Sequence, residues 1–176
     1  MKRLISSEKN KVHWLPEGTV VETYISDEMP PLEFCPSAYA LVFKNGELLQ
    51  TDLRKGERPE RMLDIPGGHV DEGEAPDVCV IRETFEETGV HITEPRLVAY
   101  KSITVTVPKP LDWNYPYPTG YMLYYICKIS EETPFDGNDD THGRVWLSKD
   151  KYDESQWYLE EKTLVDEIIK EFNIIT

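Results

Sequence analysis

The segment GHVDEGEAPDVCVIRETFEETGV, residues 68–90, constrains this chain more than any other part of its sequence. The run from Ala75 to Thr88 predicts a helix, and Gly89 follows it where helices often end in a left-handed residue. Glu83, Glu86 and Glu87 share one face of that helix, at i, i+3 and i+4. Like charges at this spacing destabilise an isolated helix, and the helix macrodipole disfavours anions near its C-terminus. The pattern therefore calls for an explanation.

Two interpretations account for these glutamates. In the first, they form a solvated acidic face of a helix whose opposite, buried face carries Val78, Ile81, Phe85 and Thr88. In the second, they hold a divalent metal ion, because carboxylate oxygens on a rigid element suit Mg²⁺ or Mn²⁺. For three glutamates alone, the first interpretation is the simpler one.

The residues around the glutamates favour the second interpretation. The segment resembles the signature box of the Nudix hydrolases: Gly, five residues, Glu, seven residues, then R-E-U-x-E-E-x-G-U, with U a bulky aliphatic residue. One position departs from this pattern, because Thr84 stands where the first U is expected. The matching positions are Gly68, Glu74, Arg82, Glu83, Glu86, Glu87, Gly89 and Val90.

The resemblance implies an α/β/α sandwich with a mixed β-sheet and a loop–helix–loop catalytic motif. It also implies hydrolysis of the pyrophosphate bond in a nucleoside diphosphate linked to another moiety, with Mg²⁺ or Mn²⁺ as cofactor. By position, Glu83, Glu86 and Glu87 would hold the metal. Arg82 and Glu74 would form an orienting ion pair, and Gly68 would allow a tight backbone turn.

Candidates outside the box come from two polar segments. The resemblance points to an acidic residue outside the box that binds metal or activates water, and for this role we favour Asp140 over Asp139. Glu86 and Glu87 are alternative bases. An aspartate-rich turn explains the same residues without function. A basic loop offers phosphate ligands, of which Arg54, at a strand end, is preferred over Arg58 and Arg61. Solvated loop charges explain these arginines equally well.

The rest of the chain predicts a mixed sheet covered by helices. Asn45-Gly46 joins two strand-like runs and is a strong hairpin signal. Pro66-Gly67-Gly68 predicts a turn. We interpret residues 1–176 as a single domain in which residues 1–35 are an N-terminal extension. The expected strands are 19–25, 37–44, 47–53, 96–106, 120–129 and 144–147, and the expected closing helix is 153–172.

Charge and cysteine content limit the partners of the chain. With 19 basic and 33 acidic residues, its net charge of −14 argues against binding to a nucleic-acid duplex or an anionic membrane. No apolar leader or membrane-length run is visible. The three separated cysteines indicate a reducing, cytoplasmic setting. We expect a small nucleotide-type ligand, and the family's frequent dimers make a homodimer reasonable.

Two other functional classes remain open. The chain could be a non-catalytic nucleotide-binding or regulatory module on the same fold, or an isomerase that uses other residues; the intact glutamates disfavour both. Substrate choice would lie outside the box, for example in the Tyr- and Pro-rich loop 107–119. Its aromatic rings offer faces for a nucleobase, although a proline-stiffened hairpin loop is the simpler interpretation.

Overall fold

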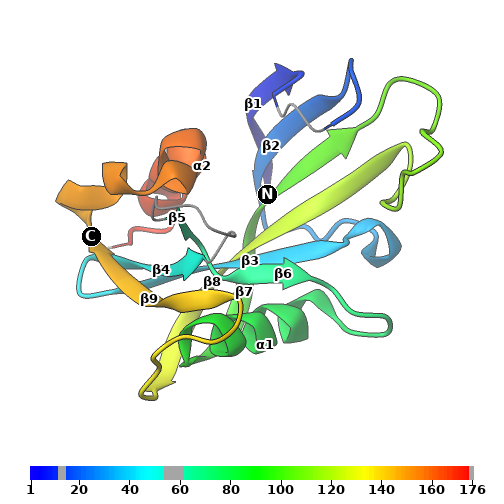
Figure 1. The fold of residues 1–176 in the computed structure, drawn as a ribbon. Coiled ribbons are helices and arrows are strands. Elements are labelled where there is room, and N and C mark those ends of the chain that lie inside the picture. The colour runs from blue at the N-terminus through cyan, green and yellow to red at the C-terminus, as the bar shows by residue number, and fades with distance from the viewer. Residues whose placement is uncertain (12–14, 54–61, 175–176) are drawn as a thin grey trace.

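The computed structural model describes residues 1–11, 15–53 and 62–174 (Figure 1). Two α-helices and two short 3-10 helices accompany nine strands in these ranges. The elements are β1 (Lys2–Lys9), β2 (Val20–Ser26), η1 (Leu32–Phe34), β3 (Ser37–Lys44), β4 (Glu47–Leu53), β5 (Met62–Asp64), β6 (Gly67–His69), α1 (Pro76–Thr88), β7 (Val90–Thr104), β8 (Thr119–Glu132), β9 (Thr141–Ser148), η2 (Lys149–Glu154) and α2 (Gln156–Glu171).

The strands form one mixed sheet in the order β1-β2-β7-β8-β3-β4-β5, with β6 paired to β3 and β9 paired to β4. Only the β3–β8 pair is parallel among the described strands. The predicted hairpin is confirmed, because Asn45 and Gly46 connect β3 to β4 and both have positive φ, 51° and 84°. This turn type matches the natural twist of two antiparallel strands.

The two long helices cover opposite faces of the sheet (Figure 1). Alternating residues of β3 separate the two cores: Leu41 packs in the cluster that contains Leu164 of α2, whereas Ala40 and Val42 pack in the cluster that contains Val80 of α1. This alternation follows from the period of two along a strand. The predicted α/β/α sandwich with a mixed sheet is therefore confirmed.

The structure adds β1 and β5 to the strands expected from the sequence and corrects the expected turn at residues 66–68. β1 was not predicted, because its eight residues are mostly polar or exposed and show no regular alternation, as suits an edge strand. The predicted turn at residues 66–68 is wrong, because only Pro66 bends and Gly67–His69 forms β6. Pairing with β3, which is distant in sequence, creates that strand.

Residues before the matched box add to the same sheet. β2 pairs with β7 from Val20 to Ile25, and β1 pairs with β2.

Among the described residues, neither α1 nor α2 combines the length and apolarity needed to cross a bilayer.

Candidate functional site

The helix that carries the glutamates is confirmed with nearly the predicted bounds. Pro76 occupies its first turn, where a missing N–H costs nothing. Gly89 ends it with φ of 67°, and the Gly89 N–H donates to the carbonyl of Phe85. A left-handed residue at this point turns the chain directly into β7.

The buried face of α1 differs from the predicted one. Thr88 is fully buried as predicted, but Val78 and Phe85 are 53% and 40% exposed, and Thr84 is also fully buried. The threonines tolerate burial because each hydroxyl donates to the carbonyl four residues earlier, from Thr84 to Val80 and from Thr88 to Thr84. Thr84, the one residue that departs from the family pattern, is therefore buried without leaving its hydroxyl unsatisfied.

Arg82 joins the loop before α1 to the helix. Its Nε and Nη2 donate to the two carboxylate oxygens of Glu74, each at 2.9 Å. Its Nη1 donates to Glu83 at 2.8 Å and to Glu86 at 3.1 Å. The hydrogen bonds from Arg82 lower the pKa of Glu74 to about 2. One guanidinium therefore organises three carboxylates of the box.

Strand β6 brings its backbone against the other side of the glutamates. The Gly67 N–H donates to Glu87 Oε2 at 3.1 Å. A Cβ added at Gly68 would stand 2.6 Å from the Glu83 carboxyl group. Gly68 does not have positive φ, in contrast to Gly67 with φ of 150°. The glycine at position 68 therefore makes room for Glu83 rather than a tight turn.

Glu87 lies in a concentration of negative charge. Burial raises the pKa of its carboxyl to about 8, and the charges of Glu83, Asp64 and Asp140 act in the same direction. No Lys or Arg of the described ranges forms an ion pair with Glu87. Asp64 was not among the site residues predicted from the sequence, although its position just before the Pro66 bend could have suggested it.

The segment from residue 133 to residue 144 holds the C-terminal end of α1. Its side chains donate to three carbonyls that the helix leaves unpaired. Asn138 Nδ2 donates to Glu86 O at 2.8 Å, Thr141 Oγ1 to Glu87 O at 3.3 Å, and Arg144 Nη1 to Thr88 O at 3.0 Å. The Thr133 N–H and hydroxyl both donate to Gly89 O. These contacts fix the backbone that carries the glutamates.

The same segment carries Asp140. The Asp140 N–H donates to Asn138 Oδ1 at 2.8 Å, so the side chain that binds the helix also orders the turn. The charge of Asp140 contributes to the raised pKa of Glu87. The other predicted candidates, Arg54, Arg58 and Arg61, lie outside the described residues.

The donor set fits a hard divalent cation in chemistry and burial. Glu83 and Glu87 supply half-buried carboxylates beside β6, and Glu86 adds an exposed one. Within the described ranges, no group of three or more Asp, Glu, His or Cys side chains is arranged so that it could hold a metal ion without rearrangement. Glu83 and Glu86 point toward Arg82, while Glu87 points toward Gly67. The crowding of negative charge around Glu87 is what a bound cation would relieve.

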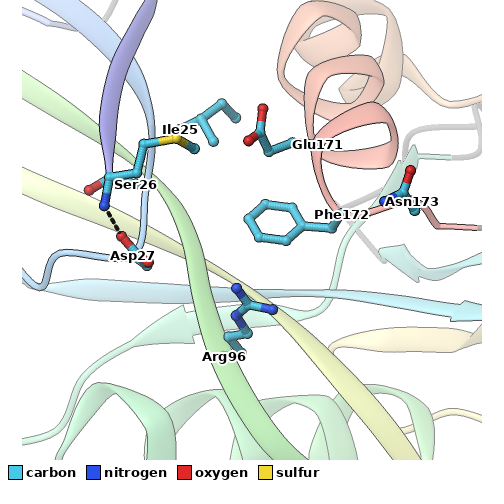
Figure 2. A pocket seen from close by; sticks show the side chains of 8 residues that line it. Ile25, Ser26, Asp27, Arg96, Glu171, Phe172 and Asn173 are labelled. Atoms are coloured by element: carbon cyan, nitrogen blue, oxygen red, sulfur yellow. Dashed lines mark hydrogen bonds and ion pairs between the residues drawn. The ribbon is translucent and has the colours of Figure 1, made fainter.

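A different cavity, of about 340 Å³, lies at the C-terminal end of α2 (Figure 2). Arg96 stands 4.9 Å from the ring centroid of Phe172 there, and the acids Asp27 and Glu171 also line it. Of the predicted functional residues that the structure describes, none lines this cavity. The functional candidates gather instead on α1, β6 and the segment before β9.

Comparisons with known proteins bear on the family and the fold of this chain. A family model described as the NUDIX domain matches residues 33–168. An 8-oxo-dGTP diphosphatase of Haemophilus influenzae is 25% identical over 128 residues, which is 72% of this chain and 84% of that protein. The structure of the Bacillus subtilis pyrophosphohydrolase BsRppH aligns with a TM-score of 0.66 and 17% identity, over 98% of this chain and 100% of that one. A NUDIX hydrolase from Nitrosomonas europaea aligns with a TM-score of 0.53 and 18% identity, over 74% and 86%.

Proposed function

This chain belongs to the NUDIX family of hydrolases, and from that premise we propose that it is a divalent-metal-dependent enzyme. The reaction is hydrolysis of the pyrophosphate bond in a nucleoside diphosphate linked to another moiety. One observation carries the proposal: Glu87 is held by the Gly67 N–H in a region where burial and three neighbouring acids oppose its ionisation. Such a concentration of carboxylates costs stability unless a cation neutralises it.

Glu83, Glu86 and Glu87 would hold the metal, which is Mg²⁺ or Mn²⁺ in this proposal. When bound, such an ion neutralises the phosphate oxygens and lowers the pKa of coordinated water. Arg82 orients Glu83 and Glu86 through its Nη1 and anchors itself on Glu74. The Gly67 N–H orients Glu87 from the opposite side.

The attacking water needs a base that accepts its proton. We propose Asp140, because Asn138 orders the turn that carries it and its charge acts on Glu87 from outside the helix. Glu86 and Glu87 are the alternative bases, because a carboxylate can accept the proton of the water. Asp140→Asn tests the assignment, because loss of the base removes the corresponding limb of the pH–rate profile.

The test is hydrolysis of a substrate panel with Mg²⁺ or Mn²⁺: dNTPs, ADP-ribose, NADH, dinucleoside polyphosphates, coenzyme A and sugar nucleotides. We expect at least one to be cleaved, and Glu86→Gln or Glu87→Gln to lower kcat by about 100-fold or more. Glu72→Gln is the matched control, because Glu72 lies in the same box but is exposed. A wild type that cleaves none of the panel, yet is stabilised by a nucleotide, would support the non-catalytic binding module instead.

Three further parts of the proposal concern the setting. We propose a small nucleotide derivative as the only ligand class, without a nucleic-acid duplex or a membrane. Cys35, Cys79 and Cys127 are all free thiols, which suits a cytoplasmic location. A homodimer remains a prediction, and light scattering on the purified chain tests it.

A further inference from the structure

A closed turn, residues 138–141, carries Asp140. The Asn138 N–H donates to the Thr141 carbonyl at 3.0 Å. In the reverse direction, Asn138 Oδ1 accepts the N–H groups of Asp140, at 2.8 Å, and of Thr141, at 2.9 Å. Asparagine favours turns because its side chain bonds to nearby backbone N–H groups in this way. The carbonyl end of the Asn138 side chain therefore fixes the backbone of Asp140.

The amide end of the same side chain leaves the turn and contacts α1. Asn138 Nδ2 donates to the Glu86 carbonyl at 2.8 Å, across 52 positions of the sequence. That carbonyl lies in the last turn of α1, where the helix itself supplies no N–H partner. A side-chain amide can make both contacts because it carries an acceptor and a donor at its tip. Asn138 therefore links the backbone of a proposed metal ligand to the backbone of Asp140.

Other contacts secure the same segment on both sides of the turn. The Thr133 N–H and the Arg144 side chain donate to carbonyls at the C-terminal end of α1, from positions before and after the turn. The Thr141 hydroxyl donates to a third carbonyl there, at 3.3 Å. These contacts hold the segment against α1 independently of Asn138. Loss of the Asn138 amide should therefore displace Asp140 rather than detach the segment.

Solvent exposure separates this role from a purely structural one. Asn138 and Asp140 are both exposed, and so is the bond from Asn138 to α1. Water can satisfy an exposed carbonyl, so such a bond contributes little to the free energy of unfolding. Geometry matters more, because a displacement of about 1 Å in a reacting group can cost on the order of 100-fold in rate. The contacts of Asn138 thus bear on the position of Asp140 more than on the stability of the fold.

We propose that Asn138 is a positioning residue, whose amide holds Asp140 in a fixed place relative to the glutamates of α1. The inference rests on the proposed function, because it assigns Asn138 a role in the same reaction. In this role Asn138 acts through Asp140 and makes no contact with substrate or metal. Its removal should lower kcat and leave KM and the melting temperature near their wild-type values.

A double-mutant cycle tests the dependence on Asp140, with a substrate of the panel that the wild type cleaves. Asn138→Ser is the informative variant, because serine retains an acceptor for the turn but is too short to reach α1. In the wild-type background it should lower kcat about 10- to 100-fold. In the Asp140→Asn background it should lower kcat less than about twofold, because residues that act together do not contribute additively. An equal fold-change in the two backgrounds would overturn the proposal.

Ser130→Ala is the matched control for the kinetic test. The Ser130 hydroxyl also makes one exposed bond to a distant carbonyl, that of His91 at 3.1 Å. Because this bond touches neither α1 nor the turn of Asp140, its loss should leave kcat at the wild-type value. A fall in kcat as large as that of Asn138→Ser would overturn the proposal, since any exposed bond would then have the same effect.

Amide hydrogen exchange tests the link without any need for activity. In Asn138→Ser the Asp140 N–H should exchange about 2- to 12-fold faster than in the wild type, as expected for the loss of one hydrogen bond. The N–H of Val80, which is buried in α1, should keep its rate. Unchanged exchange at Asp140 would overturn the proposal. Faster exchange at Asp140 in a chain that cleaves no substrate would support the placement of Asp140 by Asn138 and contradict the proposed function.

Discussion

Arg82 and Glu74 form a bidentate pair in which Nε and Nη2 each donate to one carboxylate oxygen at 2.9 Å. Such pairs combine charge with directional geometry, so they are stronger than neutral hydrogen bonds. The pair ties the loop before α1 to the helix, and the same guanidinium reaches Glu83. Through Arg82, the loop and one of the proposed metal ligands are positioned together.

Glu74→Gln should weaken this link, because it removes the negative charge and keeps the volume. We expect a loss on the order of 1–3 kcal/mol in the free energy of unfolding at pH 7. The pKa of Glu74 is lowered to about 2 from 4.5, so its stabilisation is present above pH 4.5 and is lost as pH falls toward 2. Urea denaturation at several pH values should show the difference from wild type shrinking across that range.

Asp71→Asn is the control for the Glu74 variant. Asp71 also lies near Arg82, but at 3.7 Å, and its side chain is 74% exposed. Exposed ion pairs contribute little, so this variant should lose less than about 1 kcal/mol. Equal losses in the two variants would show that the bidentate geometry does not matter.

Glu87→Gln should stabilise the metal-free protein at alkaline pH. The folded pKa of Glu87, about 8, exceeds its ordinary value of 4.5, so the folded state binds more protons between these values. The stability of the wild type should therefore fall as pH rises from 4.5 through 8, and the variant lacks this term. Denaturation in EDTA at pH 6 and pH 9 should show a gain on the order of 2 kcal/mol at the higher pH. Parallel pH profiles would contradict the burial of this carboxyl.

Gly67→Ala and Gly68→Ala should differ sharply. At Gly67 a Cβ would stand 2.4 Å from the Ala38 carbonyl oxygen, and φ is 150°, so the fold itself must shift. We expect that variant to lose about 3 kcal/mol or more. At Gly68 the atoms nearest to the added Cβ belong to the terminal carboxyl group of Glu83, which can move aside, so stability should change little while hydrolysis falls at least about tenfold. Thermal melts together with kcat measurements separate the two effects, and a matching loss of stability in both variants would refute this distinction.

Arg144→Met should loosen the end of α1. Arg144 Nη1 donates to the carbonyls of Thr88 and Thr133, at 3.0 and 2.8 Å. Without the donor both carbonyls lose a charged partner, and we expect a loss of about 1–3 kcal/mol and a lower kcat. Lys128→Met is the control, because that lysine is 70% exposed in its pair with Glu94. Amide exchange of α1 that stays at the wild-type rate in Arg144→Met would argue against the clamp.

Local sequence determined the elements whose signals are local. The α1 helix follows from its composition and from Gly89, and the β3–β4 hairpin follows from Asn45-Gly46, because each needs only residues close along the chain. The spacing of Glu83, Glu86 and Glu87 likewise marked the functional segment. The roles of these residues remain predictions that the experiments above address.

Tertiary structure decided what depends on partners distant in sequence. β6 exists because β3 pairs with it; its Gly67 N–H donates to Glu87, and its Gly68 leaves room for the Glu83 carboxyl group. The exposure of Phe85 was not predictable from helical periodicity, since α1 presents threonines to the sheet and satisfies their hydroxyls internally. Asp64 reaches the electrostatic neighbourhood of Glu87 only through the fold. The sequence alone gives the identity and spacing of the residues, whereas contacts across the sheet decide how deeply each one is buried and which charges surround it.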